Sequence, residues 1–133
     1  MYYLAYGMNM ASRCPKAKPM GGFYLPNYRL IFRGVADFRA DADAILPVVL
    51  WEITEDCLRS LDALEGYPHL YNRRQLNNGW WIYDMNGNKS HLRPPSGGYY
   101  HMIECGYRDF GLDDYNLRSA LRDADLVGLG ETA

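Results

Sequence analysis

The sequence lacks any long hydrophobic run. Its longest uninterrupted apolar stretch covers residues 44–51 and contains Pro47. A membrane-spanning helix needs roughly 20 apolar residues, so the sequence excludes one. The N-terminus also has no basic segment ahead of an apolar run, and we therefore expect no secretory signal. These absences predict a cytoplasmic protein without a membrane partner.

An excess of positive charge and a metal-binding pattern are also missing. The chain has 14 Lys and Arg against 16 Asp and Glu, and its tightest basic group is Arg73-Arg74. Nucleic-acid binding normally shows as a dense basic stripe, so we expect no nucleic-acid partner. The three histidines form neither an HxH nor an HExxH pattern. The sequence therefore predicts no metal site.

Cysteine is scarce, and the three cysteines (Cys14, Cys57 and Cys105) lie far apart. An odd number at wide spacing argues against a disulfide framework and for a reducing compartment. Cys57 falls within a predicted helix, where a thiol is expected to serve packing. Cys14 could act as a nucleophile only if a histidine approached it.

Tyrosine is the abundant residue. It supplies 12 of the 19 aromatic side chains in a chain of 133 residues. Because tyrosine combines an apolar ring with a polar tip, many of these rings are expected to line a wet cavity or the surface. The length and the 48% hydrophobic content fit one domain over residues 1–133, without wholesale disorder.

Apolar and β-branched patterns predict several short strands, at residues 1–6, 29–33, 35–38, 45–53, 71–76 and 80–84. We expect a bulge at Gly34, a loop over residues 16–22 and a polar turn over residues 39–43. Asn78-Gly79 predicts a hairpin turn. Strands and helices mix without a strict βαβα alternation, which predicts an α+β fold.

The best-bounded element is a helix over residues 55–65. Thr54 can cap its N-terminus, leucines recur at helical spacing, and Gly66 fits the position that ends a helix. Further helices are predicted at residues 10–14, 99–108 and 114–123, with a frayed tail from Val127.

The first candidate for chemistry is the turn that follows the first strand, formed by Tyr6, Gly7, Met8 and Asn9. Glycine and asparagine tolerate left-handed backbone, so the chain can turn sharply here. Consecutive backbone N–H groups in such a turn point one way and form a nest for a carboxylate or an oxyanion. The alternative interpretation is a plain turn that ends a strand.

The second candidate is Glu65, the last carboxylate of the predicted helix. The carbonyl-rich C-terminus is the wrong end of a helix for an anion. The local field and any burial would raise the pKa of Glu65, as a general base near neutral pH requires. The alternative is a solvated glutamate at a helix end. Asp62, one turn earlier, and Glu52, next to Trp51, are the rival carboxylates.

The third candidate is a set of tyrosines. Tyr71 follows the helix, and Tyr99 follows a segment rich in proline and glycine. Their phenol groups can hydrogen-bond a polar substrate, although half-buried rings on a sheet face are an equally ordinary arrangement. With Tyr6, they are the predicted pocket tyrosines, and the other nine are assigned to packing and surface.

Together, the order and spacing of these segments resemble the γ-glutamylcyclotransferase-like family. That family has a strand that runs into a Tyr-Gly-Ser-Asn turn, which residues 3–10 match except at Met8. It continues with an Ile-Thr helix start, matched within residues 51–54. A Leu-Asp-x-x-Glu-Gly segment and a later tyrosine follow, matched by residues 61–66 and Tyr71.

Near the C-terminus, the family pattern Pro-Ser-x-x-Tyr and then Gly-Leu is matched by residues 95–99 and 111–112, so the resemblance spans residues 2–115. It implies a small, partly closed mixed β-barrel flanked by short helices. It also implies an enzyme, an acyltransferase or cyclising lyase without a cofactor. The implied reaction converts a γ-glutamyl group to 5-oxoproline and releases an amine or amino acid.

The resemblance also implies roles for the candidate residues. Glu65 matches the family's glutamate and would act as general acid and base. Backbone N–H groups of Gly7, Met8 and Asn9 would hold the substrate carboxylate or the oxyanion. The pocket tyrosines Tyr6, Tyr71 and Tyr99 would line the seat of the glutamyl head. Met8 departs from the family serine, which puts the native substrate in doubt more than the chemistry.

Two alternatives remain open. The fold could serve as a binding or regulatory module for a small carboxylate ligand, because Met8 lies within the anchoring turn. The same residues could also cyclise and release a γ-glutamyl group from a larger carrier. The sequence leaves undecided the amine half of the substrate and the choice between a monomer and a homodimer.

Overall fold

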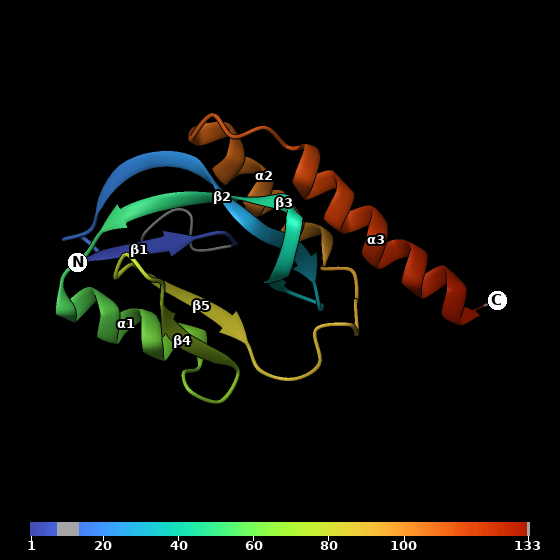
Figure 1. The fold of residues 1–133 in the computed structure, drawn as a ribbon, viewed down its shortest axis with the longest axis horizontal. Coiled ribbons are helices and arrows are strands. Elements are labelled where there is room, and N and C mark those ends of the chain that lie inside the picture. Colours follow the sequence, from blue (N-terminus) through green and yellow to red (C-terminus); the bar gives the residue numbers. More distant parts are fainter. Residues whose placement is uncertain (8–13, 133) are drawn as a thin grey trace.

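Five strands and three helices make up the part of the chain that the computed structural model describes, residues 1–7 and 14–132 (Figure 1). In chain order they are β1 (Tyr2–Ala5), β2 (Lys18–Phe32), β3 (Ala36–Glu52), α1 (Glu55–Glu65), β4 (Tyr71–Gln75), β5 (Trp81–Met85), α2 (Gly97–Asp109) and α3 (Tyr115–Thr132). Strands and helices are mixed along the chain, so the predicted α+β class is confirmed. The predicted helix at residues 10–14 falls almost entirely outside the described residues.

The strands form one mixed sheet in the order β2-β3-β1-β5-β4. β3 pairs antiparallel with both β2 and β1, while β1 and β5 are parallel and meet at Tyr3 and Trp81. β4 and β5 form the predicted antiparallel hairpin, and Gly79 has a φ of 89°. The N–H of Leu76 donates to the carbonyl of Trp80, so the loop has three residues, 77–79, rather than the two that the Asn-Gly signal predicted. β2 and β4 are the edges, so the sheet is not closed into a barrel.

Side chains, rather than a strand ladder, join β4 and β5 to the start of β3. The hydroxyl of Tyr71 donates to the carbonyl of Ala36 at 2.6 Å, and the backbone N–H of Met85 donates to a carboxylate oxygen of Asp37 at 3.0 Å. The guanidinium of Arg74 on β4 lies over the ring of Phe38 at 5.1 Å. These contacts link the β4–β5 hairpin to β3, but no strand ladder closes the sheet. The partly closed barrel that the family resemblance implies is therefore corrected to an open mixed sheet bridged by side chains.

The two longest strands correct three expectations. Residues 18–22 lie in β2 and residues 39–43 in β3, where a loop and a polar turn were predicted. Pairing with β3 overrides the local turn propensity of residues 18–22, with a register shift between Pro19 and Gly21. In β3, residues 39 and 40 pair with β2, whereas residues 41–44 fall in the register shift between Pro26 and Tyr28. Gly34, with a φ of 83°, lies in the turn that reverses the chain from β2 to β3, so the predicted bulge was wrong.

Helix α1 begins and ends where its sequence predicts. The hydroxyl of Thr54 accepts from the backbone N–H of Cys57, which caps the first turn. Gly66 adopts the left-handed conformation with a φ of 65° and donates its N–H to carbonyls of the last turn. The position of Glu65 at the end of this helix thus follows from local signals alone.

The two C-terminal helices cover β2 and β3. Ring contacts join Phe32 to Tyr100 at 6.0 Å and Trp51 to Phe110 at 6.1 Å, which pack α2 and its C-terminal cap against the sheet. α3 packs on β2, where Arg29 forms a salt bridge with Asp123. α3 continues to Thr132, so the expectation of a frayed tail from Val127 was wrong (Figure 1).

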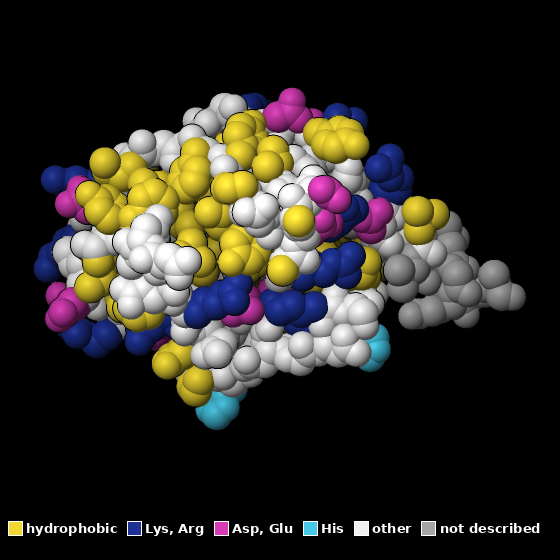
Figure 2. Space-filling model, in the orientation of Figure 1, with side chains coloured by type: hydrophobic (Ala, Val, Ile, Leu, Met, Phe, Trp, Pro, Cys, Tyr) yellow, Lys and Arg dark blue, Asp and Glu magenta, His cyan; other side chains and the backbone are white. Residues whose placement is uncertain are grey.

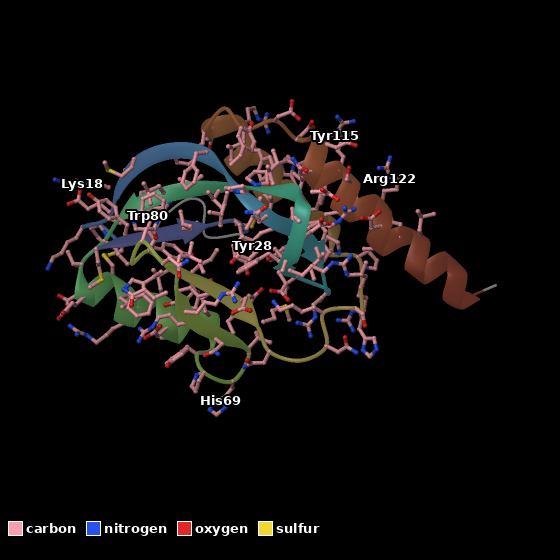
Figure 3. The ribbon with its side chains drawn as sticks, in the orientation of Figure 1. Lys18, Tyr28, His69, Trp80, Tyr115 and Arg122 are labelled. Carbon is pink, nitrogen blue, oxygen red and sulfur yellow. A yellow bond between two sulfur atoms is a disulfide. The ribbon has the colours of Figure 1, made fainter. Side chains whose placement is uncertain are left out.

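Aromatic side chains cover the opposite end of the sheet. Hydrophobic side chains gather over β1, β2 and β3 on the face shown in Figure 2. Trp80, labelled in Figure 3, contacts the rings of Tyr2 at 6.1 Å and Phe23 at 5.6 Å. These contacts tie the β4–β5 hairpin to β1 and β2 at the end where the hairpin turns.

The cysteines behave differently from the sequence expectation. Cys14 and Cys57 form a disulfide that joins the segment after β1 to α1, and Cys105 is free. Spacing in the sequence did not reveal this pairing, because the two residues are 43 positions apart and meet only through the fold. No described helix is long and apolar enough to span a membrane.

Candidate functional site

A cavity of about 140 Å³ lies where the end of β1, the end of α1 and the start of β4 meet. Five of the seven predicted site residues line it, namely Tyr6, Gly7, Glu65, Tyr71 and Tyr99. The other two, Met8 and Asn9, lie outside the described residues. The fold therefore gathers one carboxylate, one glycine and three tyrosines from four separate segments, and their roles remain predictions.

Sequence reasoning missed two further tyrosines of the cavity, Tyr3 and Tyr83. Both were assigned to packing and surface, and their rings meet edge to face at 5.8 Å. The local sequence held no signal for this, because the parallel pairing of β1 with β5 brings the two residues together. Aliphatic side chains complete the wall, and these are Val35, Leu64 and Leu70.

Hydrogen bonds to the backbone hold the tyrosine rings in place. Tyr6 donates its hydroxyl to the carbonyl of Tyr83 at 2.6 Å. Tyr71 donates to the carbonyl of Ala36, whose own N–H donates to the hydroxyl of Tyr99 at 2.9 Å. Ala36 thus fixes one tyrosine from β4 and one from α2. The cavity wall is consequently preorganised before any ligand binds.

Gly7 is needed for space at this site. A Cβ atom added here would lie 3.2 Å from the Cβ of Ala36 and 3.3 Å from the hydroxyl oxygen of Tyr99. Both distances are tighter than ordinary van der Waals contact. A side chain at position 7 would therefore press on the two groups that define one wall of the cavity.

Three tyrosines of the cavity, Tyr6, Tyr71 and Tyr83, are neutral near physiological pH. Burial is the main cause that raises the pKa of Tyr6 and of Tyr71 well above the usual value, and the neighbouring Glu65 and Asp37 raise it further. Burial and the hydrogen bond to Asp62 likewise raise the pKa of Tyr83. These phenols can donate or accept hydrogen bonds, but they cannot serve as bases near pH 7.

The buried tyrosines predict a loss of stability at alkaline pH. Their folded-state pKa is raised, so the stability is fully present below the unfolded-state pKa near 10. Above that pH the unfolded chain ionises first, and each such tyrosine lowers the free energy of unfolding by up to about 1.4 kcal/mol per pH unit. Urea denaturation between pH 8 and 11.5 measures this slope.

Tyr107 offers a matched variant for this measurement. It is buried, burial raises its pKa, and its hydroxyl has no hydrogen-bond partner among the described residues. Tyr107→Phe should leave stability at pH 7 unchanged or higher, because a buried unsatisfied hydroxyl is removed. Above about pH 10, the free energy of unfolding of this variant should also fall less steeply with pH, by the contribution of one tyrosine. A slope equal to that of the wild type would contradict the prediction.

Glu65 supplies the only carboxylate among the described residues that line the cavity. Its side chain is half-buried at the last position of α1. The rival Asp62 instead binds Arg73 and Tyr83, and the rival Glu52 is exposed at the end of β3 and does not line the cavity. The arrangement can take up and return a proton beside neutral hydrogen-bonding groups.

The size of the cavity limits what it can enclose. A cavity of about 150 Å³ holds a molecule the size of benzene, whereas pockets for whole drug-sized ligands are about 300–1,000 Å³. The 140 Å³ here suits one small head group, with the rest of a ligand outside. Leu64 and Leu70, at the rim, are 49% and 53% exposed.

Metal-binding groups are absent from the described part of the chain, where no three or more His, Cys, Asp or Glu side chains come together. The histidines lie away from the cavity, and His69 points out from the loop between α1 and β4 (Figure 3). The residues that line the cavity thus offer a proton carrier and hydrogen bonds rather than a ligand set.

Fold and cavity define a class of protein. The chain belongs to the family described as gamma-glutamyl cyclotransferase, AIG2-like, whose model matches residues 3–102. The matched range includes every predicted site residue and leaves α3 outside. Membership supports a cyclotransferase type of activity on a small molecule. Among curated proteins, none matches the chain significantly.

Solved structures share the fold. A gamma-glutamyl cyclotransferase is similar with a TM-score of 0.73 and 22% sequence identity, over 89% of this chain and 85% of that chain. Protein ytfP from Escherichia coli has a TM-score of 0.56 and 22% identity, over 70% and 89% of the two chains. An uncharacterized protein from Pyrococcus horikoshii has a TM-score of 0.51 and 16% identity, over 69% and 88%.

Proposed function

We propose that the protein cyclises a γ-glutamyl group to 5-oxoproline and releases the amine that the group carried, with Glu65 as general acid and base. The observation that carries the proposal is the position of Glu65 as the one described carboxylate of a cavity otherwise walled by tyrosines, aliphatic residues and Gly7. Because the tyrosines are held neutral, Glu65 is the group there suited to accept a proton near pH 7.

In the proposed reaction, both reacting groups belong to the same substrate. Glu65 removes a proton from the α-ammonium group, and the freed amine attacks the γ-carbonyl carbon. A C–N bond closes the five-membered ring while the γ-amide C–N bond breaks. Two of the three ammonium protons end on the leaving nitrogen, and Glu65 is regenerated. The enzyme's main task is to hold the folded conformer and move protons.

The turn after β1 is proposed to hold negative charge. Backbone N–H groups of Gly7, Met8 and Asn9 would bind the substrate carboxylate or the oxyanion that forms on the γ-carbonyl. Tyr6 and Tyr71 would shape the seat of the glutamyl head, since their hydroxyls already donate to backbone carbonyls. If only the backbone acts at position 8, a methionine there is compatible with the chemistry.

The rim of the cavity supports an apolar leaving group. The large hydrophobic side chains Leu64, Tyr67 and Leu70 are all exposed within one short segment after the middle of α1, and two of them line the cavity. Apolar side chains that stay exposed together at the mouth of a cavity mark a candidate contact surface for a ligand. We propose that the organic group on the leaving nitrogen carries no charge, is apolar next to that nitrogen and extends out of the cavity past this rim.

Release of 5-oxoproline from matched compounds tests the function. γ-Glutamylisopropylamide and γ-glutamylalanine differ by one methyl group in place of a carboxylate. The isopropylamide should give a kcat/KM at least about tenfold higher, since a charged group at an apolar rim loses hydration without gaining a partner. Equal values would contradict the apolar leaving group. Thermal stabilisation by both compounds without any 5-oxoproline would contradict the enzyme and favour a binding module.

A further inference from the structure

Asp62 lies one turn before Glu65 on α1 and joins three parts of the fold. One carboxylate oxygen accepts from the hydroxyl of Tyr83 on β5 at 2.6 Å. The other oxygen accepts from the guanidinium of Arg73 on β4, also at 2.6 Å. The two side chains of the ion pair are 21% and 22% exposed, so solvent screens them less than a surface pair.

Tyr83 connects Asp62 to the cavity. Its ring lines the cavity, and its backbone carbonyl accepts the hydroxyl of Tyr6. Tyr83 is therefore held at both ends: its backbone carbonyl accepts from Tyr6, and its hydroxyl donates to Asp62 on the helix that ends in Glu65. Loss of the Asp62 carboxylate would uncouple the tyrosine wall from this helix.

Arg73 holds the chain just beyond the helix. Its guanidinium lies 4.9 Å from the ring centre of Tyr67 and 4.8 Å from that of Trp81. Tyr67 in turn donates its backbone N–H to the carbonyl of Asp62 at 2.9 Å. The turn after α1 is thus clamped to the β4–β5 hairpin through two rings and one ion pair.

We infer that Asp62 is a positioning residue, which fixes the last turn of α1 and hence the Glu65 carboxylate against the cavity floor; the inference rests on the proposed function. Residues three apart on a helix share one face, so the restraint on Asp62 acts close to Glu65. Near-attack geometry is sensitive at the scale of about 1 Å, so a looser last turn should slow proton transfer more than substrate binding.

Asp62→Asn tests the inference, because it keeps the size of the side chain and removes its charge. We expect kcat for 5-oxoproline release to fall at least about tenfold, while KM changes by less than about threefold. Arg73→Met should give a similar pattern. The kcat of the double variant should be little lower than that of either single variant, because both changes break the same ion pair.

Asp56→Asn is the matched control on the same helix. Asp56 likewise pairs with an arginine, Arg59, but the two side chains are 61% and 69% exposed and do not line the cavity. Its kcat and KM should equal those of the wild type. Tyr83→Phe serves as the second variant, since it keeps the ring in the cavity wall and removes only the bond to Asp62. It should lower kcat without a large rise in KM.

The outcomes separate the two proposals. Each rate is divided by the folded fraction from circular dichroism, so a variant that merely unfolds is not scored as a loss of kcat. An active wild type with unchanged kcat in both Asp62→Asn and Tyr83→Phe overturns the positioning role and leaves the proposed function standing. The positioning role is also overturned if the Asp62→Asn and Arg73→Met variants reduce kcat by factors that simply multiply in the double variant. A wild type that forms no 5-oxoproline overturns both.

Discussion

Glu65→Gln is expected to lower kcat for 5-oxoproline release by about 10²–10⁴-fold, the usual contribution of a general acid–base group. Glutamine fills the same space and can still hydrogen-bond, but it cannot carry the proton from the α-ammonium to the leaving nitrogen. KM should change much less than kcat, since the contacts proposed for the glutamyl head are with the tyrosines and with backbone N–H groups of residues 7–9. Steady-state assays with γ-glutamylisopropylamide give both constants.

Glu52→Gln is the matched control for this substitution. Glu52 is also a glutamate that follows a hydrophobic segment, but it is exposed at the end of β3 and does not line the cavity. Its variant should retain wild-type activity. If Glu65→Gln were as active as the wild type, or if Glu52→Gln lost activity to the same degree, Glu65 would not be the base.

Asp37→Ala is expected to lower the free energy of unfolding by about 3–5 kcal/mol. The side chain of Asp37 is fully buried and accepts from Arg33 at 3.0 Å and from Lys89 at 3.0 and 3.2 Å. Its removal would leave two cations without this anion and the N–H of Met85 without its acceptor. Such a loss is a large share of the usual total of about 5–15 kcal/mol.

Urea denaturation at pH 7 measures this effect, with Asp56→Ala as the surface control. Asp56 pairs with Lys16 and Arg59, and all three side chains are more than half exposed. We expect a change within about 0.5 kcal/mol there. If both variants lost a similar free energy of unfolding, the burial of Asp37 and its ion pairs would not explain their contribution to stability.

The cluster of Asp37, Arg33 and Lys89 also supports the cavity wall. Asp37 directly follows Ala36, whose backbone holds the hydroxyls of Tyr71 and Tyr99. A shift of this part of β3 would therefore displace two tyrosines at once. No signal in the sequence pointed to Asp37, because an acidic residue inside a predicted strand is ordinarily assigned to the solvent face.

The sequence indicated the cavity residues at the ends of strands and helices, but not those inside strands. Five of the seven predicted residues line one cavity. The short motifs that carry most of them lie at the boundaries of strands and helices, which local sequence marks well: Tyr6 and Gly7 follow β1, Glu65 ends α1, and Tyr71 begins β4. Tyr3 and Tyr83 were missed, since they lie within strands, where neighbouring residues say nothing about which other strand they will face.

Sequence alone determined helix α1, its caps and the Asn-Gly hairpin turn. These depend on residues within a few positions of one another, such as Thr54 with Cys57 and Gly66 with the last helical turn. The sequence also placed Glu65 at a helix end and predicted tyrosines in a cavity, although it named only three of the five that line it.

Tertiary structure alone decided the lengths of β2 and β3, the partners of Asp37 and the disulfide between Cys14 and Cys57. Each depends on segments far apart in the chain: Lys89 is 52 residues from Asp37. Backbone pairing across the sheet outweighs the local turn preference of residues 18–22, and burial of a charge is settled only by the cations that the fold brings to it.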